Sequence, residues 1–250
     1  MKTTAFITGA TSGIGEATAK LFAKNGIRLI LCGRKTAKLK ALQAALSSLV
    51  EVTILTFDVG KREEVQKAID SLPKDFQHID ILINNAGNAH GLDPIQNGNL
   101  DDWDAMIDSN IKGLLYVSKA IIPQMVARNS GFIVNIGSTA GKEVYPNGNV
   151  YCATKSAVNA LNKAMRMDMN KHGVRVAGIH PGMVHTAFSE VRFKGDEEKS
   201  KIPYQGYQPL LAEDIADIIY FVITRPYHVN IEDLVVFPTA QASATIIDKK

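Results

Sequence analysis

The sequence predicts one α/β domain in which helices cover both faces of a seven-stranded parallel sheet, the doubly wound arrangement. Seven short apolar runs alternate along the 250 residues with segments of helical periodicity. Several of these runs are continuously apolar, which is typical of strands buried on both faces. No Pro- or Ser-rich linker and no internal repeat divides the chain, so we expect residues 1–250 to form a single domain.

The predicted strands and helices follow one another in order. Strands are expected over residues 3–8, 27–32, 52–57, 79–83, 132–136, 174–179 and 234–237. Apolar residues at helical spacing predict helices over residues 14–24, 35–46, 61–72 and 150–172. Gly26 and Gly173 stand just beyond two of these helices, where glycine commonly ends a helix. The alternation implies right-handed crossovers, which make the strands parallel.

Residues 188–209 interrupt the alternation between the sixth strand and a helix near Ala212. This segment is charged and contains both Gly and Pro. Long irregular segments inside compact domains are commonly functional loops. We therefore expect a lid over a substrate site.

Composition and charge exclude several classes of protein. The net charge is +3, from 28 Lys and Arg against 25 Asp and Glu, and the basic residues are dispersed among acidic ones, so nucleic-acid binding is not expected. No apolar run approaches the roughly 18 residues that span a bilayer, and the N-terminus leads into a strand instead of a signal peptide. Cys32 and Cys152 are too few for a disulfide framework or a zinc site. We expect reduced thiols, no metal and a cytoplasmic location.

A glycine-rich turn follows the first strand. Residues 8–15 read TGATSGIG and lead directly into a helix. Glycines let the backbone approach a pyrophosphate, and a helix N-terminus offers free N–H groups and partial positive charge. The spacing is G-x-x-x-G-x-G instead of G-x-G-x-x-G, but the context of strand, turn and helix is that of a Rossmann dinucleotide site. The residues expected to contact the cofactor here are Gly9, Thr11, Ser12, Gly13, Ile14 and Gly15.

The end of the second strand indicates which dinucleotide binds. Arg34 and Lys35 follow Gly33, and residues 27–40 contain no acidic residue. An NAD site places a carboxylate here for the ribose 2′-hydroxyl, and that carboxylate would repel a 2′-phosphate. The Arg34 guanidinium can bind a phosphate through two charge-assisted hydrogen bonds. We predict NADP as the cofactor; the alternative is that Arg34 and Lys35 are solvated charges at a helix start.

Two further strand ends are expected to face the adenosine. Asp58, followed by Val59 after the third strand, can accept a hydrogen bond from the adenine amino group, although it can equally cap the helix that begins near Lys61. The fourth strand ends in Asn84, and the small residues after it let the backbone lie beside the ribose. These residues are Asn85, Ala86 and Gly87, and alone they are also compatible with a simple turn.

Four polar residues form the predicted reacting group. Ser138 comes directly after the fifth strand, at the rim where open α/β sheets bind ligands. Tyr151 and Lys155 share one helix face because they are four residues apart. A nearby ammonium and an oxidised nicotinamide would lower the tyrosine pKa from about 10 toward a useful acid/base range. Asn110 lies inside a helical segment, where Asn has low propensity. Individually these residues also fit a turn hydroxyl, a chance pair and a helix irregularity.

Taken together, the motifs resemble those of the short-chain dehydrogenase/reductase family. They stand in the family's order and cover nearly the whole chain: TGATSGIG at 8–15, NNAG at 84–87, Asn110, Ser138, YCATK at 151–155, and Pro181-Gly182. The resemblance implies an oxidoreductase that acts on CH–OH groups through an Asn-Ser-Tyr-Lys tetrad. It also implies a homotetramer assembled through the helices around Asn110 and Val158.

The same resemblance implies a role for each residue of the tetrad. Tyr151 is the acid/base, and Lys155 lowers its pKa while holding the nicotinamide ribose. Ser138 positions the substrate, and Asn110 supports a proton-relay water. Further contacts to the nicotinamide amide and pyrophosphate are expected from Pro181, Gly182, Val184 and Thr186. One position departs from the family pattern: NADP-preferring members often carry a basic residue where this chain has Ser12, so Arg34 and Lys35 must supply the preference alone.

Several longer stretches resemble a narrower group, the NADP-dependent 3-hydroxy acid dehydrogenases that oxidise serine and allo-threonine or reduce the matching semialdehydes. These stretches are residues 85–94, 136–141, 188–196 and 226–241. A substrate of this class carries a carboxylate beside the reacting carbon, so a cation is expected near the pocket. Arg192 in the predicted lid is the candidate, with His185 as a weaker one and an exposed lid arginine as the alternative; Met183 is expected to line the pocket.

Two other functions remain compatible with the sequence. The first is a ketoreductase of the same family that acts on another class of carbonyl compound. The second is a non-catalytic protein that senses NADP, although the intact Ser138, Tyr151 and Lys155 argue against it.

Overall fold

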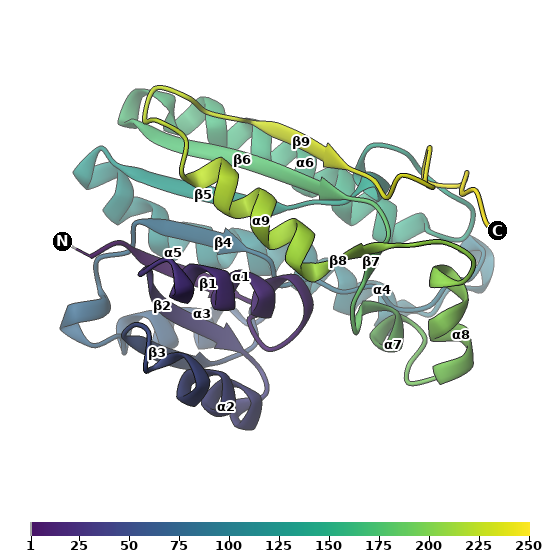
Figure 1. Ribbon diagram of the computed structural model, residues 1–250, viewed down its shortest axis with the longest axis horizontal. Helices are drawn as coiled ribbons and strands as arrows, with labels where there is room; N and C mark the ends of the chain where they lie inside the picture. The colour runs from purple at the N-terminus through teal and green to yellow at the C-terminus, as the bar shows by residue number, and fades with distance from the viewer. Residues whose placement is uncertain (1) are drawn as a thin grey trace.

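The computed structural model describes residues 2–250 and contains the predicted seven-stranded parallel sheet (Figure 1). Its strands lie in the order β3-β2-β1-β4-β5-β6-β9, and every neighbouring pair is parallel. The bounds are β1 (Thr4–Thr8), β2 (Arg28–Gly33), β3 (Val52–Thr56), β4 (Ile81–Asn84), β5 (Gly131–Ile136), β6 (Val174–Pro181) and β9 (Asp233–Val236). The chain order reverses beside β1, where such sheets bind ligands.

Helices cover both faces of this sheet, which confirms the doubly wound arrangement. The first face carries α1 (Gly13–Lys24), α2 (Thr36–Leu46) and α9 (Ala212–Ile223). The second face carries α3 (Arg62–Asp70), α5 (Gly113–Arg128) and α6 (Asn149–Met169). Side chains alternate between the two apolar clusters along each strand: in β1, Ala5 and Ile7 join the first cluster and Phe6 joins the second. The strands are continuously apolar in sequence because their side chains are buried on both faces of the sheet.

Shorter elements complete the chain. Single 3₁₀ turns are η1 (Lys74–Phe76), η2 (Ile95–Asn97), η4 (Thr139–Gly141) and η5 (Asn170–His172). A helix α4 (Leu100–Ile107) passes into α5 through a π-helical turn, η3 (Asp108–Lys112). No helix within residues 2–250 combines the length and apolarity needed to cross a membrane.

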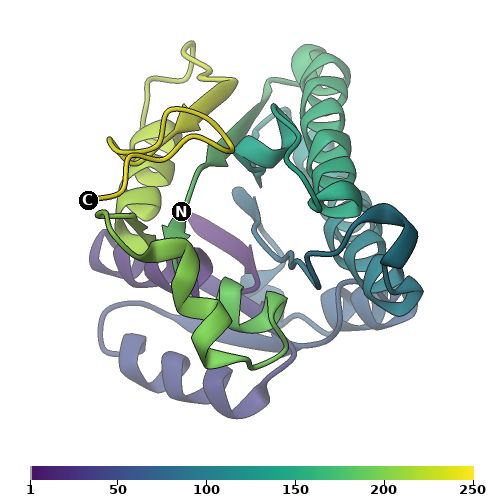
Figure 2. The ribbon, with the colours of Figure 1, turned by 90° about the vertical axis from the view of Figure 1, so that its right-hand side faces the viewer.

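The segment over residues 188–209 lies at the carboxyl edge of the sheet, in front of the strands in Figure 2. It folds into α7 (Phe188–Arg192), α8 (Glu197–Lys201) and η6 (Ile202–Tyr204). A second, two-stranded parallel sheet encloses it, made of β7 (Val184–His185) and β8 (Leu210–Leu211). These two strands carry no signal in the sequence, because two residues show no recognisable periodicity.

Candidate active site

The turn between β1 and α1 forms a backbone cradle. Gly9 has a φ of +65°, and a Cβ atom there would lie 2.9 Å from Asn85 Nδ2. A Cβ atom on Gly15 would lie 2.4 Å from the carbonyl oxygen of Gly9. The side chain of Ser12, the N-cap of α1, makes no capping hydrogen bond, so it leaves the first-turn N–H groups unblocked. A cradle of this shape fits the pyrophosphate of a dinucleotide.

Two other predicted segments meet this turn. Thr186 packs against Gly13, where an added Cβ atom would lie 3.1 Å from Thr186 Cγ2. The Asn85 side chain donates to the carbonyl oxygens of Thr8 at 2.9 Å and Gly9 at 3.2 Å. Thr8 Oγ1 in turn accepts from the N–H groups of Asn85 and Ala86. Thr8 therefore positions Asn85 and Ala86 beside the glycine turn. Nothing in the sequence pattern around Thr8 distinguishes it from any other residue at the end of a strand.

The predicted 2′-phosphate residues lie at the far end of the cradle. Arg34 is 65% exposed, and its Nη1 lies 3.7 Å from Asp58 Oδ2. Lys35 is exposed at the start of α2. Asp58 Oδ1 also accepts from Gly60 N–H at 2.9 Å, so this carboxylate holds the turn before α3 as well as facing Arg34. Next to it, Val59 packs on Gly113 at the start of α5.

The structure brings the four predicted reacting residues together. Tyr151 and Lys155 are both buried on α6, with exposed fractions of 8% and 6%. Ser138 is the N-cap of η4, and its interaction with Tyr151 is one of the influences on the tyrosine pKa. Gly87 lets the side chains of Asn110 and Lys155 approach each other: an added Cβ atom on Gly87 would lie 3.0 Å from Asn110 Oδ1 and 3.5 Å from Lys155 Nζ.

Asn110 lies in the π-helical turn η3 and holds the loop after β4. Its Oδ1 accepts from Asn88 N–H at 2.8 Å and from Ser109 Oγ at 3.1 Å. Its Nδ2 donates to the Asn88 carbonyl oxygen at 2.8 Å and to Thr154 Oγ1 at 3.0 Å. Both donor positions of the amide are used and its oxygen accepts from Asn88 N–H, so the side chain positions the Asn88 backbone. The relay water that the family resemblance implies stays a prediction.

Burial dominates the protonation of the tyrosine and the lysine. Burial raises the pKa of Tyr151 well above its usual range; Tyr145 adds to the rise, and Ser138 and Arg192 oppose it. Burial lowers the pKa of Lys155 to about 8, and its Nζ donates to the Ile136 carbonyl oxygen at 3.0 Å. Burial thus outweighs the opposing groups in the protein alone, and the expected lowering of the Tyr151 pKa by Lys155 together with an oxidised nicotinamide stays a prediction.

Arg192 lies over the ring of Tyr151. Its guanidinium carbon is 5.3 Å from the centre of the Tyr151 ring. Arg192 Nη2 donates to Tyr145 Oη at 2.7 Å, and Nε donates to the Gly91 carbonyl oxygen at 3.3 Å. The segment 188–209 thus places a positive charge against α6. Tyr145 was missed in the sequence, because only the folded lid brings it to Arg192.

The remaining predicted residues lie on the strand-end segment between the cradle and the lid. Pro181 ends β6, and Val184 begins β7. An added Cβ atom on Gly182 would lie 2.4 Å from Gln241 Oε1, and the same oxygen accepts from Met183 N–H at 2.9 Å. Gln241 is another positioning residue that the sequence did not indicate. The weaker cation candidate, His185, packs against the Tyr204 ring in a tilted arrangement, with 4.7 Å between ring centres.

Known proteins resemble this chain over nearly its whole length. The family model for short chain dehydrogenase matches residues 3–197. The chain is 44% identical to an NADP-dependent 3-hydroxy acid dehydrogenase of Salmonella typhi over 95% of this chain and 96% of that protein. It is also 44% identical to sulfoacetaldehyde reductase 2 of Chromohalobacter salexigens over 97% of both chains.

A solved structure extends the likeness to three dimensions. The closed form of a serine dehydrogenase complexed with NADP⁺ superposes with a TM-score of 0.93, at 41% identity and with 99% of both chains covered. Since the family model covers most of the sequence and the relatives span nearly its whole length, the chain belongs to the short-chain dehydrogenase family.

Proposed function

We propose that this protein is an NADP-dependent oxidoreductase that interconverts a 3-hydroxy acid, such as serine or allo-threonine, and the matching semialdehyde. The observation that carries the proposal is the Arg192 guanidinium 5.3 Å from the Tyr151 ring centre. A substrate whose reacting carbon lies at Tyr151 Oη would have a neighbouring carboxylate within reach of this cation, and Arg suits bidentate binding of a carboxylate. Relatives at 44% and 41% identity carry the names of this activity.

The cradle fits NADP as the cofactor. Unblocked N–H groups at α1, the close backbone approach at Gly15 and the exposed Arg34 provide for the pyrophosphate and the 2′-phosphate. Thr186 packs against Gly13 of the cradle and Gln241 holds the Gly182–Met183 backbone, which supports a contact of this segment with the bound cofactor. NADP(H) supplies or accepts the hydride when bound.

The protein residues would orient the substrate and move one proton. Tyr151 Oη takes the proton of the hydroxyl group in oxidation and returns one to the carbonyl oxygen in reduction. Ser138 Oγ can donate to the same substrate oxygen. Lys155 holds its ammonium beside Gly87, where the ribose hydroxyls are expected, and Asn110 fixes the loop that borders it.

A second substrate class rests on the same cation. The relative named sulfoacetaldehyde reductase matches as closely as the hydroxy acid dehydrogenase does, 44% over 97% of this chain. A sulfonate and a carboxylate both offer negative oxygens to a guanidinium. Reduction of a small sulfonated aldehyde is therefore the alternative activity.

The decisive experiment is a spectrophotometric substrate panel with purified protein. Serine, allo-threonine and simple 3-hydroxy acids are offered with NADP⁺ and, in parallel, with NAD⁺; sulfoacetaldehyde and the neutral propanal are offered with NADPH. We expect the highest kcat/KM with NADP⁺ and a hydroxy acid. Preference for sulfoacetaldehyde would select the second activity, and equal rates with propanal would contradict recognition of an anion.

Two finer properties extend the proposal. The family resemblance points to a homotetramer through α5 and α6, and Leu115 and Met167 on these helices are exposed large apolar residues. Light scattering after size exclusion tests this assembly. The free thiols of Cys32 and Cys152 support a reducing cytoplasmic location, which cell fractionation tests.

A further inference from the structure

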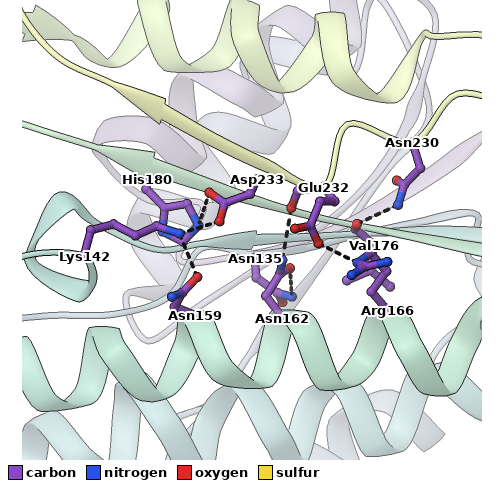
Figure 3. A network of polar contacts seen from close by, with 10 residues as sticks. All are labelled: Asn135, Lys142, Asn159, Asn162, Arg166, Val176, His180, Asn230, Glu232 and Asp233. Carbon is purple, nitrogen blue, oxygen red and sulfur yellow. Dashed lines mark hydrogen bonds and ion pairs between the residues drawn. The ribbon is translucent and has the colours of Figure 1, made fainter.

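Three charged or titratable side chains outside the tetrad, Lys142, His180 and Asp233, meet at the edge where β6 and β9 pair (Figure 3). The carboxylate of Asp233 on β9 binds the Lys142 ammonium through Oδ2. Its other oxygen, Oδ1, lies 3.4 Å from His180 Nε2 on β6. Lys142 Nζ also donates to Asn159 Oδ1 of α6 at 2.8 Å. We call Lys142, His180 and Asp233 the Asp233 brace.

The brace reaches both ends of the turn that carries Ser138. Ser138 is the N-cap of η4, and Lys142 is its C-cap. At the first end, the His180 ring occupies the space beside Gly137: a Cβ atom on Gly137 would lie 2.2 Å from His180 Nδ1. The N–H of Gly137 donates to Ile179 O at 2.7 Å, which ties this end to β6. The Asp233 carboxylate thus connects through His180 to Gly137, the residue before Ser138. Through Lys142 it also connects to the C-cap of η4.

The brace is not explained by packing alone. His180 is fully buried, and neither ring nitrogen has a hydrogen bond of normal geometry among the described residues. An unsatisfied buried polar group destabilises the folded protein, so an apolar side chain would suit the core better at this position. Burial and the Lys142 charge lower the pKa of His180, so the ring is neutral near pH 7. Burial opposes ionisation of Asp233, but the Lys142 hydrogen bond and His180 outweigh it and lower that pKa.

We infer that His180, Asp233 and Lys142 are positioning residues that hold the Ser138 hydroxyl at the reacting site. The inference rests on the proposed function only for the role of Ser138 as the group that orients the substrate. The other charged groups that face the brace are Lys155, which acts on His180, and Lys163, which acts on Asp233. Loosening the brace should therefore slow turnover through Ser138 and leave dinucleotide binding unchanged.

A double-mutant cycle tests whether the brace acts through Ser138. The four proteins are the wild type, Asp233→Asn, Ser138→Ala and the double variant, each assayed for kcat, KM and the NADPH dissociation constant. We expect Asp233→Asn to lower kcat about 10-fold in the wild-type background, since small displacements of a reacting group are costly. In the Ser138→Ala background it should lower kcat by less than about 2-fold, because coupled residues are not additive. Equal losses in both backgrounds would overturn the inference.

Glu232 offers a matched control on the same strand edge. Its carboxylate pairs with Arg166 Nε of α6 at 2.5 Å and does not touch the Ser138 turn. Glu232→Gln therefore removes a neighbouring ion pair, which joins the start of β9 to α6, and we expect kcat within about 2-fold of the wild type. A loss as large as that of Asp233→Asn would assign the effect to the general attachment of this edge and contradict the brace.

A second measurement does not depend on activity. Hydrogen exchange of the peptide covering residues 137–142 should become faster in Asp233→Asn and stay unchanged in Glu232→Gln. Unchanged exchange in Asp233→Asn would also overturn the inference. Should Asp233→Asn fail to fold, Lys142→Met, at a partly exposed side chain, carries both measurements with the same expected direction. The cycle can use any carbonyl that the wild type reduces, so a failed hydroxy acid panel would contradict the proposed function without touching the brace.

Discussion

Two halves of the carboxyl edge of the sheet differ in composition: the half at β1 and α1 is formed mainly by backbone, and the half at β5 and α6 mainly by buried polar side chains. The half at β1 and α1 forms its cradle from backbone, with glycines where a side chain would collide and the exposed cations Arg34 and Lys35 at its far end. The half at β5 and α6 uses side chains that are costly to bury, namely Tyr151 and Lys155, under the lid cation Arg192. Binding at the first half and reaction at the second should therefore be separable by mutation.

The largest effect is expected from Tyr151→Phe, which keeps the ring and removes the hydroxyl group. Loss of a positioned acid/base should lower kcat about 10³-fold. The cradle lies elsewhere, so the NADPH dissociation constant measured by fluorescence titration should stay within about 2-fold of the wild type. Retained turnover would remove Tyr151 from the reaction, and a large loss of NADPH binding would show that the two halves are not independent.

Replacement of the lid cation should act on the second half in a substrate-dependent way. Arg192→Met should lower kcat/KM for hydroxy acids about 30-fold, chiefly through KM, because hydrogen bonds to charged groups are worth about 1.5–3 kcal/mol. Propanal, which has no anion, should lose less than about 3-fold. Equal losses on both substrates would mean that Arg192 supports only the lid, through Gly91 and Tyr145.

The first half is tested by Arg34→Asp, which replaces the exposed cation with a carboxylate. The ratio of kcat/KM for NADP⁺ to that for NAD⁺ should fall at least about 10-fold, since the 2′-phosphate loses its partner and meets a like charge. The factor should be the same for every substrate, because the second half is untouched. An unchanged ratio would leave Arg34 as a solvated charge paired with Asp58.

The smallest effect concerns the stability cost of the second half. The pKa of Lys155 falls from 10.5 to about 8 in the folded protein, which corresponds to a penalty of about 3 kcal/mol at pH 7. Lys155→Met should therefore raise Tm by several degrees while removing activity. The unfolded chain binds more protons than the folded one between pH 8 and 10.5, so the wild type gains stability with rising pH in that window. The difference in Tm should shrink by about half at pH 9.5, and a constant difference across this range would contradict the pKa assignment.

Local patterns predicted the sheet, its order of elements and the cradle, since eight consecutive residues encode the turn at 8–15. The second half depends on residues that only folding brings together. Tyr145 is separated from Arg192 by 47 positions, and Gln241 is separated from Met183 by 58. The π-helical turn around Asn110 and the burial that raises the Tyr151 pKa are likewise consequences of packing, which periodicity does not report.

The small ladder of β7 and β8 has a consequence for how this enzyme can change. Because Val184 pairs with Leu210 and His185 with Leu211, the segment between them leaves and rejoins the framework at a single point. Insertions or deletions in such a closed loop leave the flanking strands in place, and each doubling of loop length costs only about 0.6 kcal/mol. We therefore expect that an exchange of residues 188–209 would alter which substrates are accepted while the sheet and the turn between β1 and α1 keep their structure.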